Sequence, residues 1–161
     1  MKIPGIFKQA RIISILLLTA TIVTFSYAAE NRGWEIGSEY NNLYDLKEND
    51  SLKGTVKKFL KVIPLPGMSE GTAFILDDKS GDDILVHLCP VSYASANQVG
   101  FRNGDKVKVK GSWAAIDGKD VFMARKVSKG DHFEFKVRLT SDGTPFWTMS
   151  AEQLAREKAS E

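Results

Sequence analysis

Leu52 to Ile63 reads L-K-G-T-V-K-K-F-L-K-V-I, a long run that is rich in β-branched residues and alternates only imperfectly between apolar and polar side chains. Such a run predicts a β-strand, and the lapses in alternation predict a strong bend with a β-bulge near Gly54 or Lys58. Pro64 to Met68 (P-L-P-G-M) then forces a loop. The first strand of the domain is therefore expected to be long and bent.

Five further strands are expected after this loop, each bounded by turn residues. They cover Thr72 to Leu76, Ile84 to Cys89, Lys106 to Gly111, Asp120 to Val127 and Phe133 to Leu139. Asp117-Gly118 is the strongest hairpin signal in the chain. Pro90 can open a helix, and the apolar residues that follow recur at helical spacing until Gly100.

This order of elements predicts a mainly β fold. Three strands, a short helix and two strands, with a long bent first strand, is the order of a five-stranded Greek-key barrel of the OB type. The strand from Phe133 would extend it. The expected fold class is therefore a five- to six-stranded OB-like Greek-key barrel with one short helix between strands 3 and 4.

A targeting signal is indicated ahead of the strands. Lys2, Lys8 and Arg11 precede an apolar run from Ile12 to Phe25, and the small residues that follow suit cleavage after Ala28. The run is shorter than the about 20 residues that cross a bilayer comfortably, so a removed signal is favoured over a retained anchor. We expect a periplasmic or otherwise exported protein, with tethering to the inner membrane through an uncleaved anchor as the alternative.

Changes in composition divide the chain into four expected parts. They are a signal peptide or anchor at 1–28, a linker or arm at 29–50, the barrel at 51–147 and a short charged helix or tail at 148–161. The linker or arm carries Trp34, Tyr40 and Tyr44 as candidate docking points. A capping-box pattern, S-A-E-Q, begins at Ser150 and opens the last helix.

The charge balance argues against a nucleic-acid partner. Three of the 22 basic residues and none of the 20 acidic ones lie in residues 1–28, which leaves 19 basic and 20 acidic residues. Nucleic-acid binding usually shows a basic excess, and export separates the protein from such partners. We expect a solvated lysine face, or else a site for an anionic glycan, a lipid headgroup or an acidic protein patch, formed by Lys106, Lys108 and Lys110 with Lys57, Lys58 and Lys61.

The only cysteine, Cys89, stands two residues after His87, one of two histidines. Strand alternation predicts that both side chains share one face. Thiolate and imidazole suit Cu(I) or Zn(II), with Met68 or Met123 as a third ligand supplied by the fold. Structural packing and a reactive thiol are the alternatives.

Other candidate sites carry weaker signals. Asp77, Asp78, Asp82 and Asp83 crowd one turn, but their spacing does not match an EF-hand loop. His132 is expected to be solvated. The sequence contains no G-x-S-x-G, no H-E-x-x-H and no phosphate-binding glycine loop, so we do not expect an enzyme.

Five motifs in order resemble the domain shared by the magnetosome proteins MamS and MamX. They are G-T-V-K-K at Gly54, P-L-P-G-M at Pro64, V-H-L-C-P at Val86, G-D-K-V-K-V-K-G at Gly104 and D-G-T-P-F-W at Asp142. The likeness covers about Ser51 to Trp147 and implies a small exported OB-like module with a weak link to iron or redox physiology. Cys89 stands where members of this family often carry glycine, and the C-x-x-C-H haem motif of some magnetosome proteins is absent.

We therefore expect a non-catalytic binding or accessory module of the bacterial cell envelope that contacts an envelope protein or a small ligand. The expected contact face combines the first three strands with the Pro64 to Met68 loop, and its candidate ligand-binding residues are His87, Met68, Tyr93 and Trp113. No cofactor is expected on this interpretation. The alternative is a metal-binding or redox-linked protein that holds copper, zinc or iron through His87 and Cys89.

Overall fold

The computed structural model describes residues 30–159, so the predicted signal peptide or anchor lies outside the described residues. The strands are β1 (Asn49–Val62), β2 (Gly71–Asp78), β3 (Asp83–Pro90), β4 (Lys106–Ile116), β5 (Lys119–Lys129) and β6 (Phe133–Lys136). The helices are α2 (Glu39–Asn42), η1 (Leu46–Glu48), η2 (Phe146–Thr148) and α3 (Ala151–Ala159). Within residues 30–159, no helix combines the length and the apolar character needed to span a bilayer.

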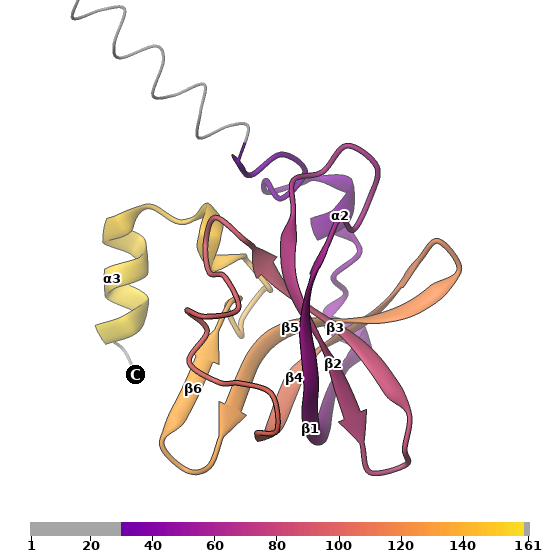
Figure 1. Cartoon of the computed structure of the whole chain (residues 1–161). Helices are drawn as coiled ribbons and strands as arrows, with labels where there is room; N and C mark the ends of the chain where they lie inside the picture. Colours follow the sequence, from indigo (N-terminus) through magenta and orange to yellow (C-terminus); the bar gives the residue numbers. More distant parts are fainter. Residues whose placement is uncertain (1–29, 160–161) are drawn as a thin grey trace, which may run out of the picture.

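The six strands form one sheet that closes on itself (Figure 1). Neighbours in the order β3-β2-β1-β4-β5-β6 are antiparallel. β3 also pairs in parallel with β5, where Val86 faces Phe122 and His87 faces Met123. This pairing joins β1 to β5 into a ring with the strand order of an OB-type barrel, and β6 extends it. The expected mainly β, barrel-like fold class is confirmed.

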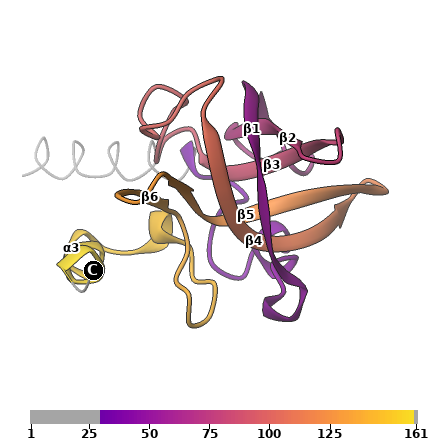
Figure 2. The ribbon, with the colours of Figure 1, turned by 90° about the horizontal axis from the view of Figure 1, so that it is seen from below.

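β1 closes the ring because it pairs with two different strands. Its first half lies against β4 and its second half against β2, and both pairings include Gly54 and Thr55. Figure 2 shows β1 running past both partners. A Cβ atom at Gly54 would lie 2.2 Å from the carbonyl oxygen of Asp77, so only glycine permits this approach. The register shifts between Val56 and Lys58, where the sequence predicted a bulge.

The residues before β1 lie on one end of the barrel as an arm, which we define as residues 30–48. Trp34 and Tyr40 are 0% and 1% exposed and belong to the same hydrophobic core as the strand residues. The indole nitrogen of Trp34 donates to the carbonyl of Ser69 at 3.0 Å. A Cβ atom at Gly71 would lie 2.4 Å from the Trp34 ring, so glycine at the start of β2 makes room for the arm.

The prediction of a helix between the third and fourth strands is wrong, because residues 91–100 form successive turns. The Pro90 carbonyl accepts from Tyr93 and Ala94, which makes a single turn. The Ala94 carbonyl then accepts from the side chains of Thr72 and Cys89 instead of from a next helical turn. Contacts with the sheet therefore override the local helical spacing.

The predicted sixth strand is too long, because β6 ends at Lys136 and not at Leu139. The amides of Val137 and Arg138 both point to the carbonyl oxygen of Arg125, which ends the regular ladder. Arg138, which strand alternation from Phe133 would put on one face with Glu134 and Lys136, is 2% exposed. The backbone turns inward here, and the side chain of Arg138 is buried in the protein.

The C-terminal segment forms α3, which lies on the β6 side of the molecule and apart from α2 (Figures 1 and 2). The capping box is formed as its sequence predicted: Ser150 N–H donates to Gln153 Oε1 at 2.9 Å, and Gln153 N–H donates to Ser150 Oγ at 3.2 Å.

Replacing Gly54 with alanine should destabilise the protein by about 1 to 3 kcal/mol, because the new methyl group collides with backbone of β2 that cannot move without opening the ring. Urea unfolding of Gly54→Ala measures this loss. Ser51→Ala, an exposed change on the same strand, is the matched control and should stay within about 0.5 kcal/mol of the natural protein. Equal stability of the two variants would contradict this account of the bend.

Candidate functional site

His87 lies inside the barrel end that the arm covers. His87 is 3% exposed, and its Nδ1 lies 3.2 Å from the hydroxyl oxygen of Tyr40, at hydrogen-bonding distance. Burial lowers the pKa of His87 to about 4. Desolvation also raises the pKa of Tyr40 well above its ordinary value. Both groups are therefore neutral near pH 7.

Cys89 is equally enclosed but has a different partner. The side chain is 0% exposed, and Sγ donates to the carbonyl of Ala94 at 3.6 Å. Burial raises the pKa of the thiol to about 12. The thiolate is the form that binds metals and attacks electrophiles, and burial disfavours that form here.

His87 and Cys89, which strand alternation places on one face, have different hydrogen-bond partners, Tyr40 and the Ala94 carbonyl. The register between β2 and β3 shifts, so that Cys89 pairs with Thr72 whereas His87 pairs with Ala73. An extra residue, Leu88, lies between these pairs and breaks the alternation. Among residues 30–159, no three His, Cys, Asp or Glu side chains gather as a metal-binding group. The copper, zinc or iron site stays a prediction.

The other candidate ligand residues each make packing contacts of their own. Met68 is 9% exposed and lies against Gly33 of the arm. The ring of Tyr93 packs at 6.2 Å from that of Trp147, and burial raises the pKa of Tyr93 to about 12. Trp113 donates from its indole nitrogen to Asp50 at 3.3 Å and packs on a core phenylalanine. Their ligand-binding roles stay predictions.

Arg138 is a buried cation that the sequence analysis did not single out. Its guanidinium carbon lies 4.7 Å from the ring centre of Tyr44 and 4.9 Å from that of Trp147. Its terminal nitrogens donate to Asn41 Oδ1 at 2.8 Å and to the Gly143 carbonyl at 3.2 Å. Burial lowers its pKa. Arg138 thereby links the arm to the C-terminal loop. Its one sequence signal is its position just before the D-G-T-P-F-W motif.

A row of lysines lies on the outside of the barrel. We define the lysine face as Lys53 of β1 with Lys106, Lys108 and Lys110 of β4. Lys53 pairs directly with Lys108 across the two strands. Val107 and Val109, between the lysines of β4, are 5% and 0% exposed, so the lysines occupy the outer side of the strand.

The lysine face lacks the carboxylates that accompany other lysines of the barrel. Lys57 pairs with Asp83 and Lys61 with Glu70, each at 2.7 Å. Similar pairs occupy Lys126 and Lys129. Within the described part of the chain, no member of the lysine face forms an ion pair. Lys57, Lys58 and Lys61, which the sequence grouped with the β4 lysines, lie in the part of β1 that runs beside β2, and the β1 lysine beside β4 is Lys53.

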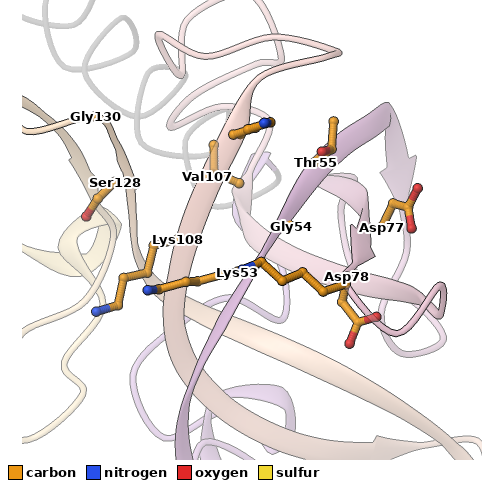
Figure 3. A pocket seen from close by; sticks show the side chains of 11 residues that line it. Lys53, Gly54, Thr55, Asp77, Asp78, Val107, Lys108, Ser128 and Gly130 are labelled. Atoms are coloured by element: carbon orange, nitrogen blue, oxygen red, sulfur yellow. The ribbon is translucent and has the colours of Figure 1, made fainter.

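A groove of about 590 Å³ opens over the part of this face that Lys53, Lys106 and Lys108 form, and Lys110 lies beyond its lining. In Figure 3 the side chains of Lys53 and Lys108 extend to one side of β1, and those of Asp77 and Asp78 lie on the other side. The residues that line it are Lys53, Gly54, Thr55, Asp77, Asp78, Lys79, Lys106, Val107, Lys108, Ser128 and Gly130. One wall is therefore cationic and the opposite edge acidic.

The acidic turn that raised the possibility of calcium is bonded within itself. Asp78 Oδ1 accepts hydrogen bonds from Ser80 and from the amide of Asp82, and these bonds lower the pKa of Asp78. Asp83 is the partner of Lys57. These contacts give the carboxylates a structural role in the turn between β2 and β3.

Lowering the pH should destabilise the protein through His87. The unfolded chain binds a proton on this ring with a pKa of about 6.5, whereas the folded chain binds it only near pH 4. The stability that the neutral ring provides is therefore complete above the unfolded pKa and is lost as the pH falls towards the folded pKa, a loss of about 3 kcal/mol.

Urea unfolding at a series of pH values measures this effect. His87→Gln should lose this part of the pH dependence, and His132→Gln, at an exposed position, should keep it. If both variants follow the natural protein across the range, His87 does not carry the effect.

Arg138→Lys should destabilise the protein by about 2 kcal/mol or more, because an ammonium cannot stack on two rings and reach two acceptors at once. Chemical unfolding measures the loss, and limited proteolysis should cut the arm faster. Arg102→Lys, at an exposed position, is the control and should behave like the natural protein. Unchanged cleavage of the arm in Arg138→Lys would contradict the proposed link.

Comparisons with known proteins place the chain in a family. Among solved structures, the N-terminal domain of PriB from Thermoanaerobacter tencongensis is similar at 19% identity and a TM-score of 0.40, and the match covers 53% of this chain and 99% of that one. No curated protein matches. The profile of the MamS/MamX magnetosome protein family matches residues 48–134, from the end of η1 into β6. The resemblance found in the sequence motifs is therefore confirmed, and the chain belongs to the MamS/MamX magnetosome protein family.

Proposed function

We propose that this protein is a non-catalytic binding module of the bacterial cell envelope, exported to the periplasm, and that its lysine face holds an anionic ligand. The observation that carries the proposal is the direct pairing of Lys53 with Lys108, neither of which forms an ion pair among the described residues. Like charges opposite each other on neighbouring strands are destabilising. An anion bound between them would remove this penalty.

The contrast with the rest of the barrel supports this interpretation. Lys57, Lys61, Lys126 and Lys129 each pair with a carboxylate on the same domain. Outside the predicted signal the chain has nearly equal numbers of basic and acidic residues, so the unpaired row is a local concentration of charge and not the result of a basic composition. Such local fields attract ligands of the opposite sign.

The shape of the groove also suits a ligand. Its volume of about 590 Å³ lies within the range of ligand sites, roughly 300 to 1,000 Å³. Thr55 and Ser128, which carry hydroxyl groups, line it together with the lysines. Lysine ammonium groups and hydroxyls donate hydrogen bonds, which is the chemistry that recognises carboxylates and phosphates.

The metal or redox alternative has less support from the geometry. His87 and Cys89 are both buried, bond to separate partners and are held in neutral forms by burial. Metal binding there would need the thiol to lose its proton in an enclosed site, whereas the lysine face is reachable from solvent. Export is supported by the predicted signal segment, which precedes the described residues.

Removing the central lysine pair should weaken the binding of anionic probes. We expect the full mature protein to bind at least one of three probes at low salt: inorganic pyrophosphate, polyglutamate or phosphatidylglycerol vesicles. Lys53→Gln/Lys108→Gln should bind about tenfold more weakly by calorimetry or vesicle sedimentation.

Lys58→Gln/Lys119→Gln removes the same charge from exposed positions outside the groove and should bind like the natural protein. The proposal fails if no probe binds, or if the two double variants lose affinity equally.

A further inference from the structure

We infer that the ligand of the lysine face is an extended acidic segment of a partner protein, with carboxylates at alternate positions. This inference rests on the proposed function and names the class of its ligand. Lys106, Lys108 and Lys110 occupy every second position of one strand. Side chains at such positions point to one side and repeat about every 7 Å.

The spacing of the β4 lysines favours an extended polypeptide as the ligand, because alternate residues of such a segment have the same spacing. Carboxylates at alternate positions of an extended segment also point to one side, about 7 Å apart. Such a segment can bring one carboxylate to each lysine of β4 at the same time. Lys53 faces the middle lysine, so the central carboxylate meets two ammonium groups.

Neighbouring residues complete a strip of donors along the two strands. Ser51 pairs with Lys110 and Thr55 pairs with Lys106, so hydroxyl groups flank Lys53 on β1. These hydroxyls can donate to carboxylates or to the carbonyl groups of a bound segment. The strip is therefore linear, as an extended chain requires.

Binding must occur through side chains and not through strand addition. In the stretch that carries the lysine face, β1 pairs with β4, and β4 also pairs with β5 through Lys108–Ser128 and Lys110–Lys126. Lys108 and Lys110 thus lie on a stretch of strand with a partner on each side, and Lys106 pairs with β1. Charge spacing on the outer surface, more than main-chain hydrogen bonding, would decide which segment binds.

Two other anions fit the geometry less well. A compact phosphate needs donors that converge on one point, whereas these lysines are spread along a strand. A membrane surface is broad and negative, and it would bring charge against Asp77 and Asp78 at the other edge of the groove. A single extended chain can follow the lysines without covering that edge.

Two peptide isomers test the inference on the full mature protein. Each contains three aspartates and six threonines: the first has aspartates at its third, fifth and seventh positions, the second at its second, fifth and eighth. Only the first presents all three carboxylates on one side when extended. We expect it to bind at least about fivefold more tightly at low salt.

Lysine variants test whether the preference for the first peptide comes from the lysines of β4. Lys106→Gln/Lys110→Gln should reduce the preference for the first peptide to less than about twofold, and Lys58→Gln/Lys119→Gln should leave it unchanged. Equal binding of the two peptides overturns the inference, as does tighter binding of phosphatidylglycerol vesicles than of either peptide. If pyrophosphate binds while the peptides do not differ, only the inference fails. If no anionic probe binds, the proposed function fails with it.

Discussion

The bend of β1 at Gly54 is the constraint on which the rest of the structure depends. One strand can serve both β4 and β2 only if its backbone approaches the carbonyl oxygen of Asp77 more closely than any side chain would allow. The ring then closes through the contact between β3 and β5. The same bend sets Lys53 opposite Lys108, because the register at Gly54 fixes which outer residues face each other. Barrel closure and the charged row are thus two results of one local geometry.

The two candidate sites, the barrel end around His87 and the lysine face, differ in their access to solvent. At the barrel end, the arm brings Trp34 and Tyr40 over His87, and burial favours the neutral forms of Tyr40, His87 and Cys89. Arg138 remains charged among aromatic rings and fixes the arm in place. The barrel end is therefore closed to solvent by the arm. On the outer side of β1 and β4 the lysines keep access to solvent, so charge can act there on another molecule.

Local patterns predicted the features that local physics determines. The strands, the bulge after Val56 and the cap at Ser150 follow from alternation and from short-range hydrogen bonds, and all three are present. The helix after Pro90 failed because Thr72, distant in sequence, takes the Ala94 carbonyl. The lysine grouping differs from the structure in part because Asp83 and Glu70 neutralise two of its members, and the register that selects Lys53 is a long-range property. Burial of Arg138 likewise depends on rings and acceptors from both ends of the domain.

The inner side of β4 explains how the outer side can carry unpaired charge. Val107 and Val109 are almost fully buried, and burying such a side chain contributes about 1.5 to 3 kcal/mol. A like-charge pair across two strands is destabilising, and cross-strand side-chain pairs in general act on a scale of roughly 0.2 to 1 kcal/mol. The inner residues therefore decide the register and stability of the strand, with enough surplus to tolerate repulsion between Lys53 and Lys108. Because pairing does not depend on the outer residues, their side chains can be charged without loss of the strand. The backbone fixes the spacing of these charges, and the proposed preference for an extended acidic segment rests on that spacing.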